Sequence, residues 1–428
     1  MVTHSLPGSE DITRVELPNG IVVLARENFF SQSVAVQGFI RSGSLYDPPE
    51  KLGLSGLTAS LMMRGTQNRG FDQLFEAQES VGARLAINSG THLTSLSGYC
   101  LAEDLLGQLG LLAEMLREPL FDPIEMEKLR KQFLTGLDLR ANDTGAIAEL
   151  NFDALIYGSH PYARPDEGYP ETIKSITRED VLEHHRTIFG PEGMALCVVG
   201  AVKSNQAVEW INQTFGDWKN PDQRKEIQIS DAIPPEKPQR KHVTLPGKIQ
   251  TDLIMGVMAM KRDDPDYIPA QLANSILGEF GMMGRIGMEV REKSGLAYYA
   301  ASGLGASIAQ GTWDFNARVN PENLEKTIAL INQVIRDFLK EGVQQEDLRD
   351  NQDAFIGRLP LGLESNRGVA KAVLDLERKK RGFDYYYNFA DMVRAITPER
   401  VTEVARKYLT TPNHVISSCG PRLKKKGK

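Results

Sequence analysis

The chain repeats itself at an offset of 219–220 residues, and this duplication limits the folds that it can adopt. Ile176–Val181 (ITREDV) matches Ile396–Val401 (ITPERV), and 24 residues after each isoleucine an apolar segment ends in glycine, at Gly200 and Gly420. Two earlier blocks repeat at the same offset: Ala102–Leu105 with Pro321–Leu324, and Glu127–Arg130 with Glu346–Arg349. Separate matches at one offset indicate two homologous domains in tandem.

A polar segment separates the two copies. Residues 220–241 contain four prolines, at positions 221, 234, 235 and 238, which cannot continue a helix or a central strand. A chain of 428 residues is also too long for a single core. We therefore predict an N-terminal domain over 1–219, a linker over 220–241 and a C-terminal domain over 242–428.

Local patterns within each copy are mixed. Arg14–Ala25 resembles a hairpin around Asn19-Gly20, and Ser33–Ile40 alternates as a strand does. Leu105–Leu116 and Leu324–Leu339 carry apolar residues at helical spacing. Thr177 and Thr397 precede further helices as N-cap residues. These patterns predict an α+β fold with two tandem homologous domains, each a largely antiparallel sheet with helices packed on one face.

Composition excludes several classes of function. The net charge of −6 provides no basic field for nucleic acid, and no apolar run is long enough to cross a membrane. The N-terminal residues lack the charged and apolar regions of a signal or transit peptide. Three widely spaced cysteines, without a CxxC pair, favour reduced thiols in a protein core. We expect a cytoplasmic protein with neither a nucleic-acid nor a membrane partner.

The segment Gly53–Thr66 (GLSGLTASLMMRGT) is the most specific motif. It resembles the G-[LV]-A-H-x-x-E-H-x-x-x-x-G-T signature of the pitrilysin/insulinase family of metallopeptidases. On that pattern the two metal-binding histidines fall on Gly56 and Ser60, and the general-base glutamate falls on Ala59. The family's third ligand, a glutamate, falls at or near Leu137.

None of these four residues can do the work that the resemblance implies. Zinc hydrolysis requires protein ligands with an open position for water, and a carboxylate that removes the proton of that water. Glycine, alanine and leucine supply no such groups, and the Ser60 hydroxyl is a poor zinc ligand at neutral pH. We expect neither a metal nor another cofactor in this chain, and no peptidase activity from the chain alone.

Two further blocks extend the resemblance over nearly the whole chain. Ser159–Pro165 (SHPYARP) resembles the family's H-P-Y-G-R-P element, and Gly284–Tyr298 resembles its S-R-L-F-x-E-V-R-E-K-x-G-L-A-Y block. In the family an arginine and a tyrosine of that block bind the substrate carbonyl and stabilise its oxyanion. The match implies these roles for Arg291 and Tyr298. The alternative is a surface ion pair for Arg291 and a packed position for Tyr298.

Glycines recur immediately before and within this block, at Gly278, Gly281 and Gly284. The segment resembles the glycine-rich stretch of the non-zinc (alpha) subunit of processing peptidases, which implies substrate binding. The alternative is a helix entry that needs small residues for close packing.

The resemblance therefore implies a non-catalytic subunit. This chain is expected to pair with a zinc-bearing homologue as a heterodimer, to bind a peptide substrate, and to supply Arg291 and Tyr298 to the partner's site. An alternative from another class is a non-enzymatic homodimeric scaffold or peptide-binding protein. An independent hydrolase is a third hypothesis, and it requires a metal elsewhere.

Overall fold

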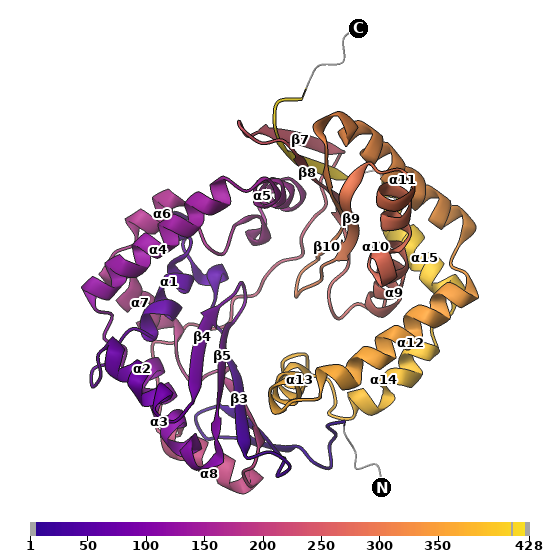
Figure 1. The fold of residues 1–428 in the computed structure, drawn as a ribbon. Coiled ribbons are helices and arrows are strands. Elements are labelled where there is room, and N and C mark those ends of the chain that lie inside the picture. Colours follow the sequence, from indigo (N-terminus) through magenta and orange to yellow (C-terminus); the bar gives the residue numbers. More distant parts are fainter. Residues whose placement is uncertain (1–5, 412–413, 424–428) are drawn as a thin grey trace. The chain divides into compact units, whose positions relative to one another are not determined.

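The computed structural model describes residues 6–411 and 414–423, without the side chains of residues 280–283. The chain divides into two compact units, and each unit includes a segment from the other half of the sequence (Figure 1). Unit 1 comprises Met1–Leu137, Pro165–Ile227 and Arg358–Phe389, and unit 2 comprises Asp138–Arg164, Gln228–Gly357 and Ala390–Lys428. The predicted domains, 1–219 and 242–428, follow the repeat in the sequence, whereas these units follow contacts in space. The domain boundaries therefore stay a prediction.

Unit 1 is built on a six-stranded sheet in the order β1-β2-β6-β3-β5-β4. Its strands are β1 (Thr13–Glu16), β2 (Val22–Glu27), β3 (Ser33–Ile40), β4 (Arg84–Ser89), β5 (Thr94–Leu101) and β6 (Ala195–Gly200). Only the β2–β6 pair is parallel, and the other pairs are antiparallel.

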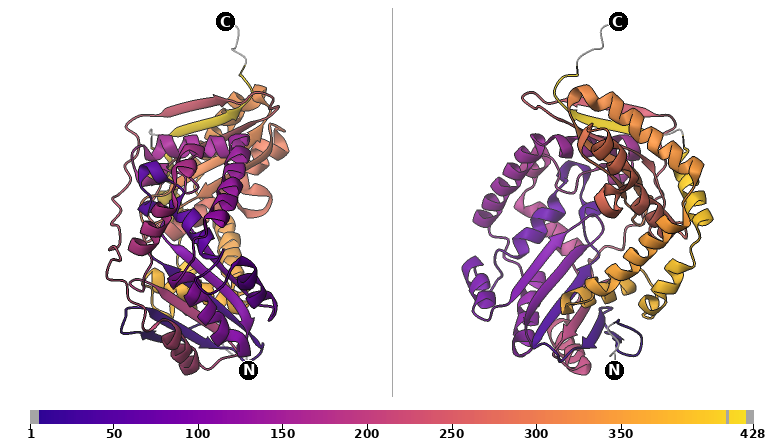
Figure 2. Two further views of the ribbon diagram at one scale, coloured as in Figure 1. Left: turned by 90° about the vertical axis from the view of Figure 1, so that its left-hand side faces the viewer. Right: turned by 45° about the vertical axis from the view of Figure 1, so that its right-hand side comes forward.

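Unit 2 is built on a five-stranded sheet in the order β7-β11-β8-β10-β9. Its strands are β7 (Gln239–Thr244), β8 (Thr251–Met258), β9 (Ala297–Leu304), β10 (Thr312–Val319) and β11 (Val415–Gly420). Its one parallel pair, β7–β11, corresponds to β2–β6, and the remaining order repeats that of unit 1. Figure 2 shows β7 and β11 side by side. The shared topology confirms the duplication that the sequence predicts, and it confirms the α+β class.

Most helices cover one face of each sheet. Unit 1 has α1 (Leu54–Met62), α2 (Phe71–Glu79), α3 (Leu105–Arg117), α4 (Pro123–Ala141), α6 (Pro170–Ser175), α7 (Arg178–Ile188) and α8 (Ser204–Phe215). Unit 2 has α9 (Tyr267–Gly278), α10 (Phe280–Gly287), α11 (Leu324–Glu341), α12 (Gln345–Gly362) and α15 (Pro398–Leu409). Three helices cross a boundary between the units, so that their last residues belong to the other unit: α4, α12 and α14 (Tyr385–Arg394). Each helical layer encloses a separate apolar core with one face of its sheet.

The second face of the unit 1 sheet is covered by α13 (Asn366–Arg378), which comes from the C-terminal half of the sequence. Val369, Ala370 and Val373 of this helix are buried together with residues of β2, β3 and β6. A bidentate ion pair from Arg14 of β1 to Glu377, with both N–O distances 2.9 Å, holds the end of the helix.

The second face of the unit 2 sheet is covered by α5 (Thr144–Tyr157), which comes from the N-terminal half of the sequence. Ala148, Phe152 and Ile156 are buried against β8 and β11. α5 and α13 begin 222 residues apart, at Thr144 and Asn366, so they are the equivalent helices of the two copies. The duplicated sequence has therefore exchanged one helix between its two sheets.

The local sequence predictions are confirmed in detail. β3 spans residues 33–40, and α3 and α11 begin at Leu105 and Leu324 as predicted. The Thr177 and Thr397 hydroxyls accept hydrogen bonds from the backbone N–H groups of Asp180 and Arg400. The three cysteines are buried and unpaired. Among the described residues, none of the helices combines the length and apolar character needed to span a bilayer.

The position of α13 leads to a first prediction. Val373→Asp should lower the free energy of unfolding of unit 1 by about 3 kcal/mol or more, because it buries a carboxylate without a partner. Hydrogen exchange of the β3 and β6 amides should accelerate correspondingly. Lys371→Asp, on the exposed side of the same helix, is the matched control. Unchanged exchange in β3 and β6 of the Val373 variant would contradict the place of α13 in this unit.

Candidate functional site

The helix with the family signature, α1, is fixed at its N-terminus by a buried carboxylate. Asp47 accepts hydrogen bonds from the backbone N–H of Gly53 at 3.0 Å and of Ser55 at 2.9 Å. These are the unpaired N–H groups that every helix start leaves. Gly53 itself has φ 93°, a left-handed conformation that favours glycine.

Three positions of the predicted zinc motif lie on α1 and the fourth lies on α4, which contacts α1 at Gly56. A Cβ built on Gly56 would lie 3.5 Å from Cε1 of Phe133, so the two helices are in contact there. Leu137 lies one turn after Phe133 and is buried in the same core as Ala59. The Ser60 hydroxyl donates to the Gly56 carbonyl at 2.9 Å. The structure thus brings the four positions onto two neighbouring helices.

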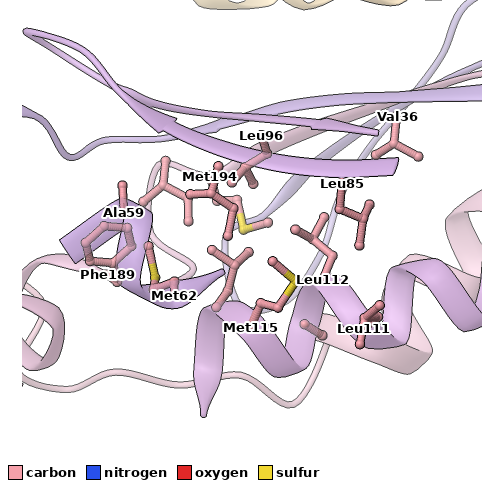
Figure 3. Close-up of a cluster of buried hydrophobic side chains, with 14 of the residues drawn as sticks. Val36, Ala59, Met62, Leu85, Leu96, Leu111, Leu112, Met115, Phe189 and Met194 are labelled. Atoms are coloured by element: carbon pink, nitrogen blue, oxygen red, sulfur yellow. The ribbon is translucent and has the colours of Figure 1, made fainter. Parts of the chain in front are cut away.

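Apolar packing surrounds α1. Figure 3 shows Ala59 and Met62 among the side chains of Phe189, Met194 and Leu96, and the first two are at most 1% exposed. No group of three His, Cys, Asp or Glu side chains among the described residues is arranged to hold a metal ion. A glycine, an alanine, a leucine and a serine whose hydroxyl bonds within the helix do not fit zinc.

The sequence analysis did not identify a buried polar cluster at the start of α1, formed by Asp47, Ser55 and His184. The Ser55 hydroxyl lies 2.5 Å from Asp47 Oδ1 and 3.2 Å from His184 Nε2 on α7. It contains the residue types of a catalytic triad, but Ser55 lies between the other two and is 1% exposed. A nucleophile must reach substrate. The cluster instead joins α1 to α7, and burial lowers the pKa of His184 to about 3.

In unit 2 the arginine and tyrosine predicted to bind substrate lie on consecutive elements. Arg291 lies in a π-helix, Met288–Lys293, with its Nε 3.4 Å from Glu292 Oε1. Such π-turns are frequent at functional sites. Tyr298 is the second residue of β9 and is 80% exposed. Tyr298 is therefore not packed in the core, whereas the contact of Arg291 with Glu292 is the surface ion pair of the alternative. A role of either residue in substrate binding stays a prediction.

Tyr298 borders a cavity of about 540 Å³ between α5 and the exposed half of the unit 2 sheet. α5 covers β7, β8 and β11, so the face of β9 and β10 beyond it is left open. The acidic and basic residues that line this cavity are Glu149, Asp153, Asp252, Asp314 and Arg318. The sequence analysis did not identify them. Glu149 and Asp153 lie one turn apart beside an apolar stripe, which is the only signal that the sequence offered.

The cavity is acidic, and burial affects its carboxyl groups. Asp252 is neutralised by Arg318, with Nε–Oδ1 at 2.8 Å, and accepts a hydrogen bond from Thr144 Oγ1 at 2.5 Å. Burial raises the pKa of Asp153 to about 7 and that of Asp314 to about 6. Neighbouring carboxylates add to both shifts, Glu149 in each case. The lining therefore favours a cationic group, which would relieve this repulsion.

Gly278 and Gly284, upstream of Arg291, are required by packing. A Cβ on Gly278 would lie 2.3 Å from the Ser302 nitrogen, and one on Gly284 would lie 2.6 Å from the Gly278 nitrogen. Gly284 also has φ 62° and lines a second cavity, of about 670 Å³, with residues of α11 and α12. Gly281 lies in the part of α10 whose side chains are outside the description. A role of these glycines in substrate binding stays a prediction.

Profiles of known families match most of the chain. Residues 22–164 match "Insulinase (Peptidase family M16)" and residues 175–355 match "Peptidase M16 inactive domain". The chain belongs to the insulinase family. This membership confirms the resemblance found in the sequence, and the degenerate helix α1 lies within the first matched segment.

Individual known proteins are similar to this chain over nearly their full length. An uncharacterized zinc protease of Mycobacterium leprae is 24% identical over 432 residues, which cover 98% of this chain and 94% of that protein. An uncharacterized zinc protease of Bacillus subtilis is 22% identical, with coverages of 93% and 96%. The crystal structure of a peptidase M16 inactive domain from Pseudomonas fluorescens has a TM-score of 0.90 and 25% identity, with coverages of 97% and 99%.

The half-buried Asp153 leads to a prediction about pH. Its raised pKa means that the folded protein keeps a proton that the unfolded chain releases above about pH 4. The stabilisation from this group is therefore complete below pH 4 and is lost as the pH rises through 7. Asp153→Asn should raise the free energy of unfolding at pH 8 by about 1–3 kcal/mol, measured by urea denaturation, and should have little effect at pH 4.

Asp138→Asn, at an exposed position near the end of α4, is the control and should change neither value. An Asp153 variant that is less stable than the natural protein at pH 8 would contradict the assigned direction of the shift.

Proposed function

We propose that this chain is the zinc-free subunit of a two-chain peptidase, in which a zinc-bearing homologue supplies the metal and the general base. The observation that carries the proposal is the asymmetry between the two copies. In unit 1 the positions of the metal ligands are occupied by Gly56, Ser60 and Leu137, none of which offers zinc a suitable ligand. In unit 2 both Arg291 and the 80% exposed Tyr298 are retained, and Tyr298 lines an open, acidic cavity.

The chemistry available to this chain is binding and charge stabilisation. A guanidinium and a phenol are donors suited to the oxyanion that forms when water attacks a peptide carbonyl, and removal of one such donor typically reduces the rate about 10²–10³-fold. Tyr298 is free to act on a ligand because it is neither packed nor engaged by the core. The acidic lining formed by Glu149, Asp153 and Asp314 would receive a cationic side chain of the bound peptide.

A non-enzymatic homodimeric scaffold is the competing hypothesis. It requires no zinc-bearing partner and gives Arg291 and Tyr298 no role beyond folding. The two hypotheses therefore differ in what happens on mixing with a homologue and in what happens when these two residues are replaced.

The first test is reconstitution. We expect the purified chain to contain clearly substoichiometric zinc by elemental analysis and to cleave no peptide by itself, because α1 offers no ligand set. Mixed with a zinc-bearing homologue from the same organism, it should form a complex and increase peptide turnover above that of the homologue alone. Stoichiometric zinc in the isolated chain, or a mixture that neither associates nor gains activity, would exclude the proposal.

The second test concerns the two donors in the reconstituted complex. Arg291→Ala and Tyr298→Phe should each lower kcat/KM by about 10²-fold while complex formation and the unfolding midpoint stay unchanged. Arg336→Ala, at an exposed position of α11, should retain full activity. Activity that is equal in all three variants would support the scaffold instead.

A further inference from the structure

In the part of the chain that the structure describes, the unit 2 sheet lacks a counterpart of β1, and the edge of β7 is therefore exposed. β1 pairs antiparallel with β2 at one end of the unit 1 sheet. Its counterpart in the repeat would pair with β7, which corresponds to β2, but β7 is the terminal strand of the unit 2 sheet. An edge strand leaves a row of backbone N–H and C=O groups without a partner in the sheet.

The direction of these groups follows from printed hydrogen bonds at both ends of β7. The Gln239 N–H donates to the His414 carbonyl at 3.0 Å, and the Leu245 N–H donates to the Gly420 carbonyl at 2.7 Å. Alternate residues of a strand therefore point toward β11, and those between them point outward. The outward set comprises Arg240, His242 and Thr244. β7 begins 217 residues after β2, so Arg240 and His242 correspond to Val23 and Ala25. In unit 1 those two residues pair with Val15 and Thr13 of β1.

The segment that could have formed the missing strand is held elsewhere. Residues 230–233 occupy the place of β1 at the same spacing of 217 residues, but they adopt no strand. The Ala232 N–H donates to Gln310 Oε1 at 2.8 Å, and Ala232 is buried. Asp231 forms an ion pair with Lys261. These contacts bind the segment to the β8 and β9–β10 ends of the unit, and no strand within the described residues pairs with the outer edge of β7.

The composition of the edge is basic, unlike that of its counterpart. Residues 236–248 contain four basic residues, Lys237, Arg240, Lys241 and Lys248, against the single acidic residue Glu236, in a chain whose net charge is −6. β2 has Val22–Ala25 (VVLA) where β7 has Gln239–His242 (QRKH). Arg240 is paired with Glu325, whereas Lys241 is exposed and forms no ion pair with a described residue.

We propose that the free edge of β7 is a docking site for an extended, acidic segment of a partner protein. The segment adds antiparallel to β7 and takes the position that β1 has in unit 1. Its backbone bonds with Arg240, His242 and Thr244, as in recognition by β-strand addition. Its acidic side chains lie opposite Lys241 and the neighbouring lysines, where opposite charges stabilise cross-strand pairs. The alternative explanation of these basic residues is that they only protect the edge strand from aggregation.

A peptide pair distinguishes the two readings. The probes are a short capped peptide of alternating valine and glutamate and its valine–lysine counterpart, each added to the full chain. With the glutamate peptide we expect hydrogen exchange at the Arg240, His242 and Thr244 amides to slow by about tenfold at saturation, while the Lys241 amide is unaffected. The lysine peptide should leave all four amides unchanged. No protection by either peptide, or equal protection by both, would overturn the proposal.

Two variants complete the test. Thr244→Pro removes an outward N–H without breaking a bond to β11, and should abolish protection by the glutamate peptide, whereas Thr244→Val should retain it. Lys241→Glu should reverse the preference toward the lysine peptide. Binding by Thr244→Pro equal to that by Thr244→Val would overturn the proposal, as would self-association of the natural chain through β7.

Discussion

Each sheet of this protein has a second apolar face that a helix from the other half of the sequence buries. Val369, Ala370 and Val373 of α13 are at most 4% exposed on the unit 1 sheet, and Ala148, Phe152 and Ile156 of α5 are at most 1% exposed on that of unit 2. Full burial of a branched aliphatic side chain contributes about 1.5–3 kcal/mol. The same exchange shapes the candidate site, because α5 forms one wall of the acidic cavity beside Tyr298.

Helix α1 is held in place by contacts with other residues of unit 1, although its motif positions carry no side chains suited to zinc. α1 retains the contacts that place it: the Asp47 carboxylate at its start, the link through Ser55 to His184, and apolar neighbours along its length. None of these contacts involves a metal. Ala59 belongs to the core, and Gly56 accommodates the ring of Phe133 without a clash. Hydrogen bonds and apolar packing together hold α1 in unit 1, whereas the exposed Tyr298 lies in unit 2.

The sequence predicted what is local and what is repeated. Strand β3, the starts of α3 and α11 and the two threonine caps follow from patterns within a few residues, and the duplication follows from matched blocks. The helix exchange could not be predicted, because the apolar stripe of α13 shows that one side is buried but not which sheet buries it. The acidic cavity was missed for a similar reason. In the sequence, Glu149 and Asp153 have the spacing of an ordinary solvent-exposed helix face. Only the structure shows that they line a cavity together with Asp314 of β10.

The exchange also bears on the origin of the chain. A protein with only one copy of the repeat would have a sheet with one bare face and a helix, equivalent to α5 or α13, with no sheet of its own to cover. It could bury both only by trading that helix with a second identical molecule, as domain-swapped dimers do. A gene duplication that joined two such molecules end to end would turn this intermolecular trade into an intramolecular one. Each copy could then diverge at its own ligand-binding residues while still depending on the other for a helix.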